Sequence, residues 1–254
     1  MTLSQEKSNH FFSHKVSGLI WKVQTNERNS LLAIESRNFE LKQAAFSVLN
    51  FENGTVHFKE KVFEEPWNLT LRFIDEENLI LSRQEQANSP ESKGILSVSI
   101  YGGDVTWERY NLSLDAVAAK GLRVFDPKIN PRRYSWLDPL NGETIAEPKN
   151  IDMDLSTISF PKKHNQSVLP DSILGVEIVG EIFSMTHKDH LIMSFHEKIK
   201  DKIQQRILVY QEDSILHDNI LIKDIQKLQP ESFFIQKNHL FYIKNKNEIV
   251  SFLL

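Results

Sequence analysis

Short stretches in which apolar and small polar residues alternate are spread along the whole chain. The clearest example spans residues 79–108, where residues 94–100 alternate with a period of two and Gly102 and Gly103 precede a further apolar run. A period of two is typical of β-strands that bury one face, and paired glycines favour a tight turn between antiparallel strands. The pattern therefore predicts a strand–turn–strand unit in this region.

The same unit recurs along the chain. Strands led by leucine are predicted around five markers: Leu32, Leu79, Leu122, Leu191 and Leu240. The steps between these markers are 47, 43, 69 and 49 residues, and counting from the last marker past the chain end to the first gives 46. Because three internal steps agree with the step across the ends, we expect a closed ring of repeats rather than a linear array.

The strands that follow each marker keep the same register. Second strands are predicted to begin at Phe46, Ile95, Tyr134 and Ile207, and third strands at Val56, Val105, Thr144 and Ile215. In the first three units the two starting points lie ten residues apart. The turns between them carry Asn53–Gly54, Gly102–Gly103 and Asn141–Gly142, which predict type I′ turns with positive φ at both central residues. A further strand precedes each marker, so each unit has four strands.

These units predict an all-β fold, a single closed β-propeller of five four-stranded blades in one domain of residues 1–254. The fifth unit ends before its last strand, and residues 10–16 can supply it, so the ring would be closed by the N- and C-terminal strands. The long step contains residues 145–175, interpreted as an excursion from the ring, with a sixth, poorly formed blade as the alternative. A helical interpretation of residues 197–205 and 218–229 competes only weakly, because both segments are short and flanked by strand patterns.

Two resemblances follow from these motifs. Residues 94–108 are similar to the repeat of quinoprotein-like propellers, in which a strand, a turn of the Asp-x-x-Thr-Gly type and a tryptophan recur in each blade. The whole chain also resembles an uncharacterised bacterial family of propeller-like proteins with no assigned function. The features that carry this second resemblance are residues 18–21, Glu35 with Arg37, Trp67, and Pro90 with residues 93–95 ahead of Trp107. The resemblance implies a propeller fold and does not bring quinone chemistry with it.

Composition removes several classes of function. The chain has no cysteine, so disulfides, thiolate metal sites and cysteine nucleophiles are excluded. A net charge of -4 offers no electrostatic basis for binding nucleic acid or an anionic membrane. Residues 1–7 are polar, and no apolar run approaches the roughly 20 residues that span a bilayer. We therefore expect a cytoplasmic, monomeric protein without a cofactor, whose partner is a protein or a small molecule.

Five residues are candidates for a ligand site at the mouth of the central channel. Glu35 and Arg37 are two positions apart on one predicted inner strand and therefore share a face. Arg83, Arg123 and His196 occupy comparable positions in other units, with Lys244 near a fifth. Together they could form a cationic funnel for an anionic ligand. The alternatives are a structural ion pair between blades for Glu35 and Arg37, and solvated loop ends for the rest.

Other polar and aromatic groups have ordinary explanations beside functional ones. His187, Asp189 and His190 could bind a metal, but a hairpin turn with ordinary surface histidines is the favoured explanation. Asp152 and Asp154 could hold a cation or act as paired carboxylates, although exposed loop acids are far commoner. The four tryptophans could form a shelf for a ligand or pack between blades.

No motif in the sequence identifies a reaction. The leading hypothesis is a non-enzymatic binding or scaffold propeller, and the alternative is a hydrolase or lyase with its site at the central channel. An enzyme would need titratable groups that converge in a pocket, whereas a scaffold would need an exposed apolar or aromatic patch.

Overall fold

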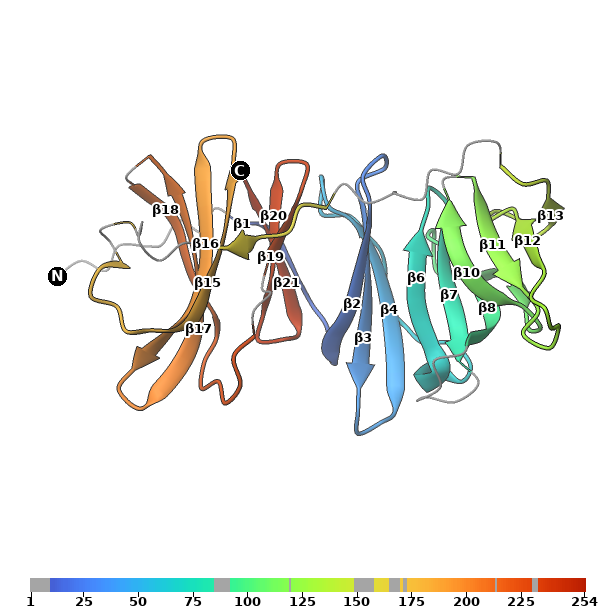
Figure 1. Ribbon diagram of the computed structural model, residues 1–254, viewed down its shortest axis with the longest axis horizontal. Coiled ribbons are helices and arrows are strands. Elements are labelled where there is room, and N and C mark those ends of the chain that lie inside the picture. Colours follow the sequence, from blue (N-terminus) through green and yellow to red (C-terminus); the bar gives the residue numbers. More distant parts are fainter. Residues whose placement is uncertain are drawn as a thin grey trace. The chain divides into compact units, whose positions relative to one another are not determined.

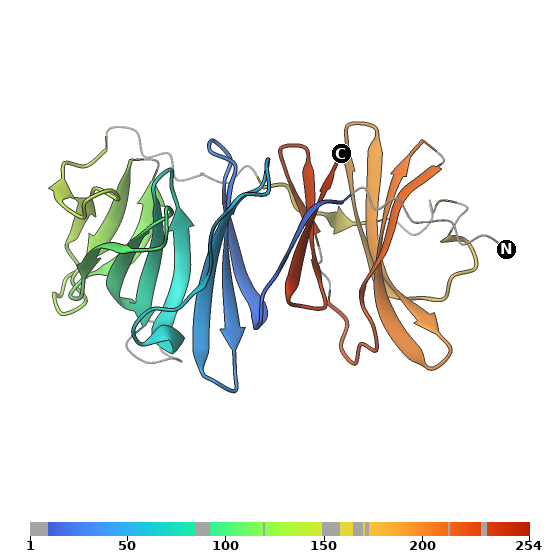
Figure 2. The ribbon, with the colours of Figure 1, turned by 180° about the vertical axis from the view of Figure 1, so that it is seen from behind.

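The computed structural model describes residues 10–84, 92–118, 120–148, 158–164, 170, 173–212, 214–229 and 233–254. These residues form five antiparallel sheets and one short 3-10 helix, η1 (Pro66–Asn68) (Figures 1 and 2). Within the described ranges, no helical segment has the length and apolar character of a membrane span. The sheets divide between two compact units, residues 16–157 and residues 1–15 with 158–254.

The unit of residues 16–157 contains three sheets. The first has the order β2 (Leu19–Asn26), β3 (Leu31–Asn38), β4 (Gln43–Asn50) and β5 (Val56–Lys61). The second has the order β6 (Leu69–Ile74), β7 (Asn78–Gln84), β8 (Ser92–Ser99) and β9 (Val105–Arg109). The third has the order β10 (Ser113–Ala118), β11 (Gly121–Phe125), β12 (Tyr134–Leu137) and β13 (Thr144–Ile145).

The other unit contains two sheets. One has the order β14 (Lys162–Lys163), β15 (Ile178–His187), β16 (His190–Ile199), β17 (Lys202–Gln211) and β18 (Ser214–Ile222). The other has the order β1 (His10–Lys15), β21 (Glu248–Leu253), β20 (His239–Lys244) and β19 (Phe233–Gln236). Both sheets are antiparallel throughout.

The predicted β-propeller architecture of five blades is confirmed. All five leucine markers lie in the second strand of their repeat, and β1 completes the last sheet by pairing with β21. The two segments weighed as helices belong instead to β16, β17 and β18 and the loop that follows β18. Closure of the five sheets into one ring, in one domain, stays a prediction.

Two details differ from the prediction. One blade has five strands rather than four, because β14 pairs with β15 through Lys162 and Lys163. This added strand comes from the proposed excursion, whose residue Ser159 also forms a bridge with Ile235. Among the described residues of 145–175, Ser159, Lys162 and Lys163 join existing sheets and no sixth blade is built, while residues 149–157, 165–169, 171 and 172 lie outside the described ranges.

The turns between the third and fourth strands of the blades are also not type I′ in the Asn-Gly units. Gly54 and Gly142 have positive φ, but Asn53 and Asn141 do not. In three blades the glycine N–H instead donates to a carbonyl four residues earlier, a pattern shared by Gly54 with Asn50, Gly103 with Ser99, and Gly142 with Asp138. The loop therefore spans four residues. In the two Asn-Gly loops only the glycine of the pair has positive φ, whereas Gly102 and Gly103 both do.

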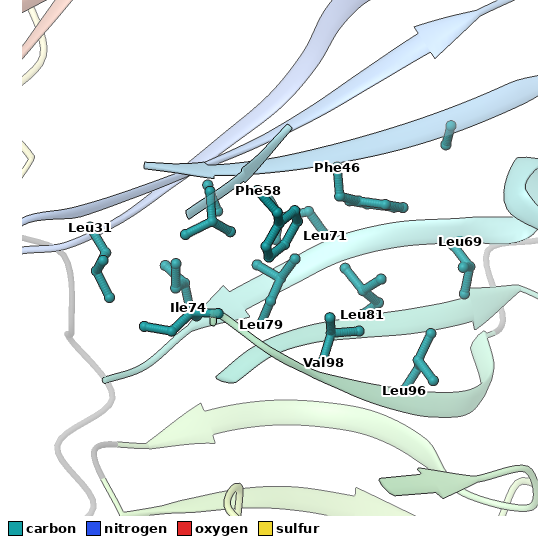
Figure 3. Packing of buried hydrophobic residues seen from close by; sticks show 14 residues of the cluster. Leu31, Phe46, Phe58, Leu69, Leu71, Ile74, Leu79, Leu81, Leu96 and Val98 are labelled. Carbon is teal, nitrogen blue, oxygen red and sulfur yellow. The ribbon is translucent and has the colours of Figure 1, made fainter. Parts of the chain in front are cut away.

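Buried apolar side chains between neighbouring sheets hold each unit together. In one unit Phe46 of β4 and Phe58 of β5 meet Leu71, Leu79 and other residues of the β6–β9 sheet (Figure 3). A second cluster joins the β6–β9 sheet to the β10–β13 sheet, and a third joins β16–β18 to β19–β21. Strands such as β3 are buried on both faces, so any polar side chain on them needs a partner within the protein.

Candidate functional site: an arginine between two tryptophans

Glu35 and Arg37 lie side by side on β3, as their spacing predicts. The Nε atom of Arg37 donates to Oε1 of Glu35 at 2.7 Å. Both side chains are buried although each of them carries a charge. β3 lies between β2 and β4, so these residues are not on an edge strand of their sheet. The structure thus brings together the first two of the five candidate residues.

The pair makes its remaining contacts with the neighbouring sheet. Oε2 of Glu35 accepts the N–H of Leu71 at 2.7 Å and the hydroxyl of Thr70 at 3.0 Å. Nη2 of Arg37 donates to the carbonyl of Leu69 at 3.1 Å. Because all three partners belong to β6, the ion pair ties the β2–β5 sheet to the β6–β9 sheet. Its geometry is that of a structural contact between blades.

Two tryptophans enclose the guanidinium of Arg37. Its Cζ lies 5.2 Å from the ring centroid of Trp21 on β2 and 5.1 Å from that of Trp67 in η1. Phe39 packs edge-on against both rings, with centroids 5.9 Å from Trp21 and 5.3 Å from Trp67. Close approach to aromatic rings suits a guanidinium better than an ammonium group. We call Trp21, Phe39 and Trp67 the aromatic cluster.

Local sequence explains why the aromatic cluster forms. Gly18 lies against the backbone of Arg37, where an added Cβ would come within 2.7 Å of its carbonyl carbon and oxygen, so the chain can enter β2 here only without a side chain. Pro66 begins η1, a position that suits its fixed φ, and places Trp67 next. The side chain of Trp21 remains 57% exposed and that of Phe39 50% exposed. The cluster is therefore a surface feature built over a buried ion pair.

Lys22 extends the polar network beneath the cluster. Its Nζ donates to the carbonyl of Leu71 at 2.6 Å. Burial lowers the pKa of Lys22 and the nearby charge of Arg72 lowers it further, while Glu35 opposes both effects. The Lys22 ammonium thus has a hydrogen-bond acceptor inside the protein, but Glu35 offsets its charge only in part.

Arg83 and Arg123 repeat part of this arrangement in their own blades. Arg83 on β7 pairs with Glu108 at 2.7 Å and with Glu65 at 2.9 Å, and it lies 5.9 Å from the ring centroid of Tyr110. This blade thus sets an arginine against a carboxylate and an aromatic ring, as the blade of Arg37 does.

In the third blade, Arg123 on β11 contacts Asp115 of β10. The two groups lie 2.6 Å apart, and the guanidinium of Arg123 lies 5.2 Å from the ring centroid of Tyr134. Both predicted funnel cations are therefore already ion-paired. A role in ligand binding stays a prediction for these residues.

Comparison with known proteins finds a family whose model matches a segment that carries part of this site. Residues 25–107 match the family described as "Domain of unknown function (DUF4905)". The resemblance to an uncharacterised family is confirmed over this segment, which contains the Glu35–Arg37 pair and Trp67. No curated protein matches the chain significantly.

Solved structures with a similar fold are remote. The Cps50 (Swd1) β-propeller domain of Myceliophteria thermophila is 12% identical, with 93% of this chain and 70% of that chain covered and a TM-score of 0.31. An oligogalacturonate lyase in complex with manganese is 7% identical, with 95% and 90% covered and a TM-score of 0.32. The Dos1 propeller is 10% identical, with 96% and 87% covered and a TM-score of 0.25.

The fifth candidate, His196, lies on β16 in the other unit. Its side chain is buried, and Nε2 accepts the N–H of Gln229 at 3.2 Å. Burial lowers the pKa of His196, so the neutral ring is favoured at this position. The contact holds the segment after β18 against the β14–β18 sheet, which is a structural task.

The other histidines do not form a metal centre among the described residues. His187 and His190 are paired across the tight β15–β16 hairpin, as predicted, but His190 is buried and not a surface residue. Asp152 and Asp154 lie outside the described ranges. Trp107 supports the packing interpretation of the tryptophans, because its Nε1 donates to the carbonyl of Pro139 in the next blade at 2.9 Å.

Sequence reasoning missed one member of the aromatic cluster. Phe39 was not a candidate, although it stands two positions after Arg37 and four after Glu35, where residues of a continuing strand would share a face. An aromatic residue at this spacing from a charged pair is the signal that could have revealed it.

Proposed function

We propose that this protein is a non-enzymatic binding propeller that holds a protein partner on its aromatic cluster. The observation that carries the proposal is the exposure of Trp21 and Phe39 around the guanidinium of Arg37. Hydrogen bonds to Glu35 and to the carbonyl of Leu69 hold this guanidinium in place. Tryptophan and arginine are enriched among the residues that dominate binding energy at protein interfaces. The rings are held in place before binding, so little side-chain entropy is lost when a partner arrives.

The buried ion pair supports a binding role rather than a hydrolase or lyase. Both carboxylate oxygens of Glu35 already accept hydrogen bonds from the protein, and the Nε of Arg37 is directed at Glu35. A general acid or base must reach the proton it transfers within hydrogen-bond distance. Neither group can reach a substrate at the surface, whereas the rings of Trp21 and Phe39 are exposed to a binding partner.

The chemistry of the cluster suggests the kind of partner. Edge-to-face rings offer a flat apolar surface, and the guanidinium between Trp21 and Trp67 has little exposed surface left for an anion. We therefore expect a protein segment that presents proline or aliphatic side chains, bound by this protein as a cytoplasmic monomer. A segment rich in carboxylates is disfavoured.

Site-specific photo-crosslinking tests the proposal in the native cell. A photoreactive phenylalanine analogue replaces Phe39 in one strain and the exposed Tyr101 in the control strain. We expect a discrete crosslinked protein from position 39 and none of the same mass from position 101. Equal crosslinking at both positions, or only diffuse products, would contradict the proposal.

Titration of the captured partner then tests the energetic role of the cluster. Trp21→Ala should weaken binding at least about tenfold, which is the loss of about 1.4 kcal/mol expected for one central aromatic residue. The control Tyr101→Ala should bind within about twofold of the unmodified protein. Unchanged affinity of Trp21→Ala would place the partner elsewhere on the protein.

A further inference from the structure

A polar cavity of about 730 Å³ lies in the unit that contains β14–β21, whereas the aromatic cluster belongs to the other unit. Its walls come from β16, β17 and β18 and from the turn between β20 and β21. Cavities of about 300–1,000 Å³ are of the size that holds a small molecule. Lys244, predicted from the sequence to lie near the funnel, lines this cavity, but the proposed partner surface does not account for it.

Arg206 organises one wall of the cavity. Its guanidinium makes a two-point contact with Asp218, at 2.7 Å from Nε and 2.5 Å from Nη2, and contacts Glu197 at 3.2 Å. Glu197 also accepts from the amide of Gln204 at 2.6 Å. Both carboxylates of this wall are therefore engaged by donors of the protein. They are poorly placed to neutralise other cations of the cavity.

Lysines line other parts of the cavity. Lys223 and Lys244 line the first cavity, and a second cavity of about 370 Å³ is lined by Lys223, Lys227 and Lys246. None of these four lysines has an ion pair with a described carboxylate, whereas Asp224 beside them pairs with Lys202 at 2.9 Å. Lys223 is shared by both cavities. The protein has a net charge of -4, so this concentration of positive charge is local.

Backbone hydrogen bonds fix the two segments that carry the lysines. The N–H of Asn245 donates to the carbonyl of Leu221 at 2.8 Å and holds the β20–β21 turn beside the end of β18. The N–H of Ile225 donates to the carbonyl of Ile203 at 2.8 Å and holds the loop after β18 against β17. The lysines are thus presented by anchored backbone from two separate sheets.

We propose that these adjoining cavities bind a small soluble ligand that carries two or more phosphate groups. Lysine ammonium groups bind phosphate as compact point charges, and several phosphates are needed to engage lysines spread over two cavities. The side-chain amides of Asn219 and Asn245 supply further donors at the first cavity. A concave site in a net acidic protein fits a small molecule better than an extended nucleic acid, which requires a basic surface along its length.

Calorimetric titration with sodium tripolyphosphate tests the proposal directly. We expect saturable binding that weakens as sodium chloride is raised, because charge attraction is screened by salt. Lys223→Gln/Lys244→Gln should bind at least tenfold more weakly. The charge-retaining Lys223→Arg/Lys244→Arg should stay within a few-fold of the unmodified protein, and thermal melting checks that each variant folds.

Two controls separate a site from general attraction. Lys162→Gln/Lys200→Gln removes the same charge from exposed positions of the same unit and should leave affinity unchanged within about twofold. An equal loss in this control, or no binding of tripolyphosphate by the unmodified protein, would overturn the proposal. Tighter binding of a single-stranded oligonucleotide than of tripolyphosphate would overturn the assignment to a small ligand.

Discussion

Nε of Arg37 lies 2.7 Å from Oε1 of Glu35, and the side chains of the two residues are only 8% and 0% exposed. Burying both charges is costly, and their attraction offsets this cost only when the remaining donors and acceptors are also satisfied. The next sheet supplies these hydrogen bonds through Leu69, Thr70 and Leu71. The packing of the two sheets therefore depends on an intact ion pair between Glu35 and Arg37.

Removing one charge of this pair should destabilise the unit strongly. Glu35→Gln leaves the guanidinium of Arg37 buried without a counter-charge, and we expect a loss of about 3–5 kcal/mol in the free energy of unfolding. Urea unfolding measures the change. The control Glu40→Gln alters an exposed carboxylate on the loop after β3 and should change stability by less than about 0.5 kcal/mol. A loss below about 1 kcal/mol for Glu35→Gln would contradict the structural role.

Replacing both charges should restore part of this loss. Glu35→Leu/Arg37→Met removes the unpaired charge along with its partner, and apolar replacements of buried ion pairs are often neutral or stabilising. We expect the double variant to be more stable than Glu35→Gln in the same urea titration. If it is less stable, the hydrogen bonds to β6 outweigh the cost of burying the two charges.

The turn glycines offer a matched test of packing between blades. An added Cβ on Gly142 would come within 2.7 Å of the Trp107 ring, whereas one on Gly102 would approach nothing nearer than 4.0 Å. Both glycines have positive φ, so alanine strains the backbone at either position. We expect Gly142→Ala to cost about 1–3 kcal/mol more than Gly102→Ala in thermal unfolding. Similar costs would show that Trp107 moves aside freely.

His196 should make the stability of its unit depend on pH. Burial lowers its folded-state pKa below the ordinary value of 6.5, so the unfolded chain takes up a proton first as the pH falls. The stability contributed by the neutral ring is complete above pH 6.5 and is lost progressively as the pH falls toward the folded-state pKa. We expect His196→Gln to flatten this part of the curve of melting temperature against pH. The control His57→Gln should leave this pH dependence of the melting temperature unchanged.

The strands could be predicted because their signal is local. Alternation around Leu79 or Leu122 depends only on neighbouring residues, and the spacing of the repeats then gives the blades. The turns at Asn53 and Asn141 were predicted wrongly, because the Asn-Gly pair also suits a loop in which only the glycine has positive φ. The dipeptide alone does not distinguish the two geometries.

The candidate site could be predicted only where one strand carries it. Glu35 and Arg37 share a face of β3, so their contact follows from a period of two. Their partners on β6 lie more than thirty residues away, and the position of Trp67 depends on how two sheets pack. The lysine cavities depend in the same way on contacts between sheets, which leave no pattern within either segment.

Removing β1 tests whether the N-terminus completes the last blade. β1 pairs with β21, Ser13 donates to Glu248, and the Phe12 ring lies 6.3 Å from that of Phe241. Deleting residues 1–15 should expose the backbone of β21 and lower the free energy of unfolding by about 2 kcal/mol or more, since several strand hydrogen bonds are lost at about 1 kcal/mol each. Amide hydrogen exchange should then accelerate in β20 and β21. Deleting only residues 1–8 should leave exchange unchanged, and protection of β21 without β1 would mean that the sheet is stable with three strands.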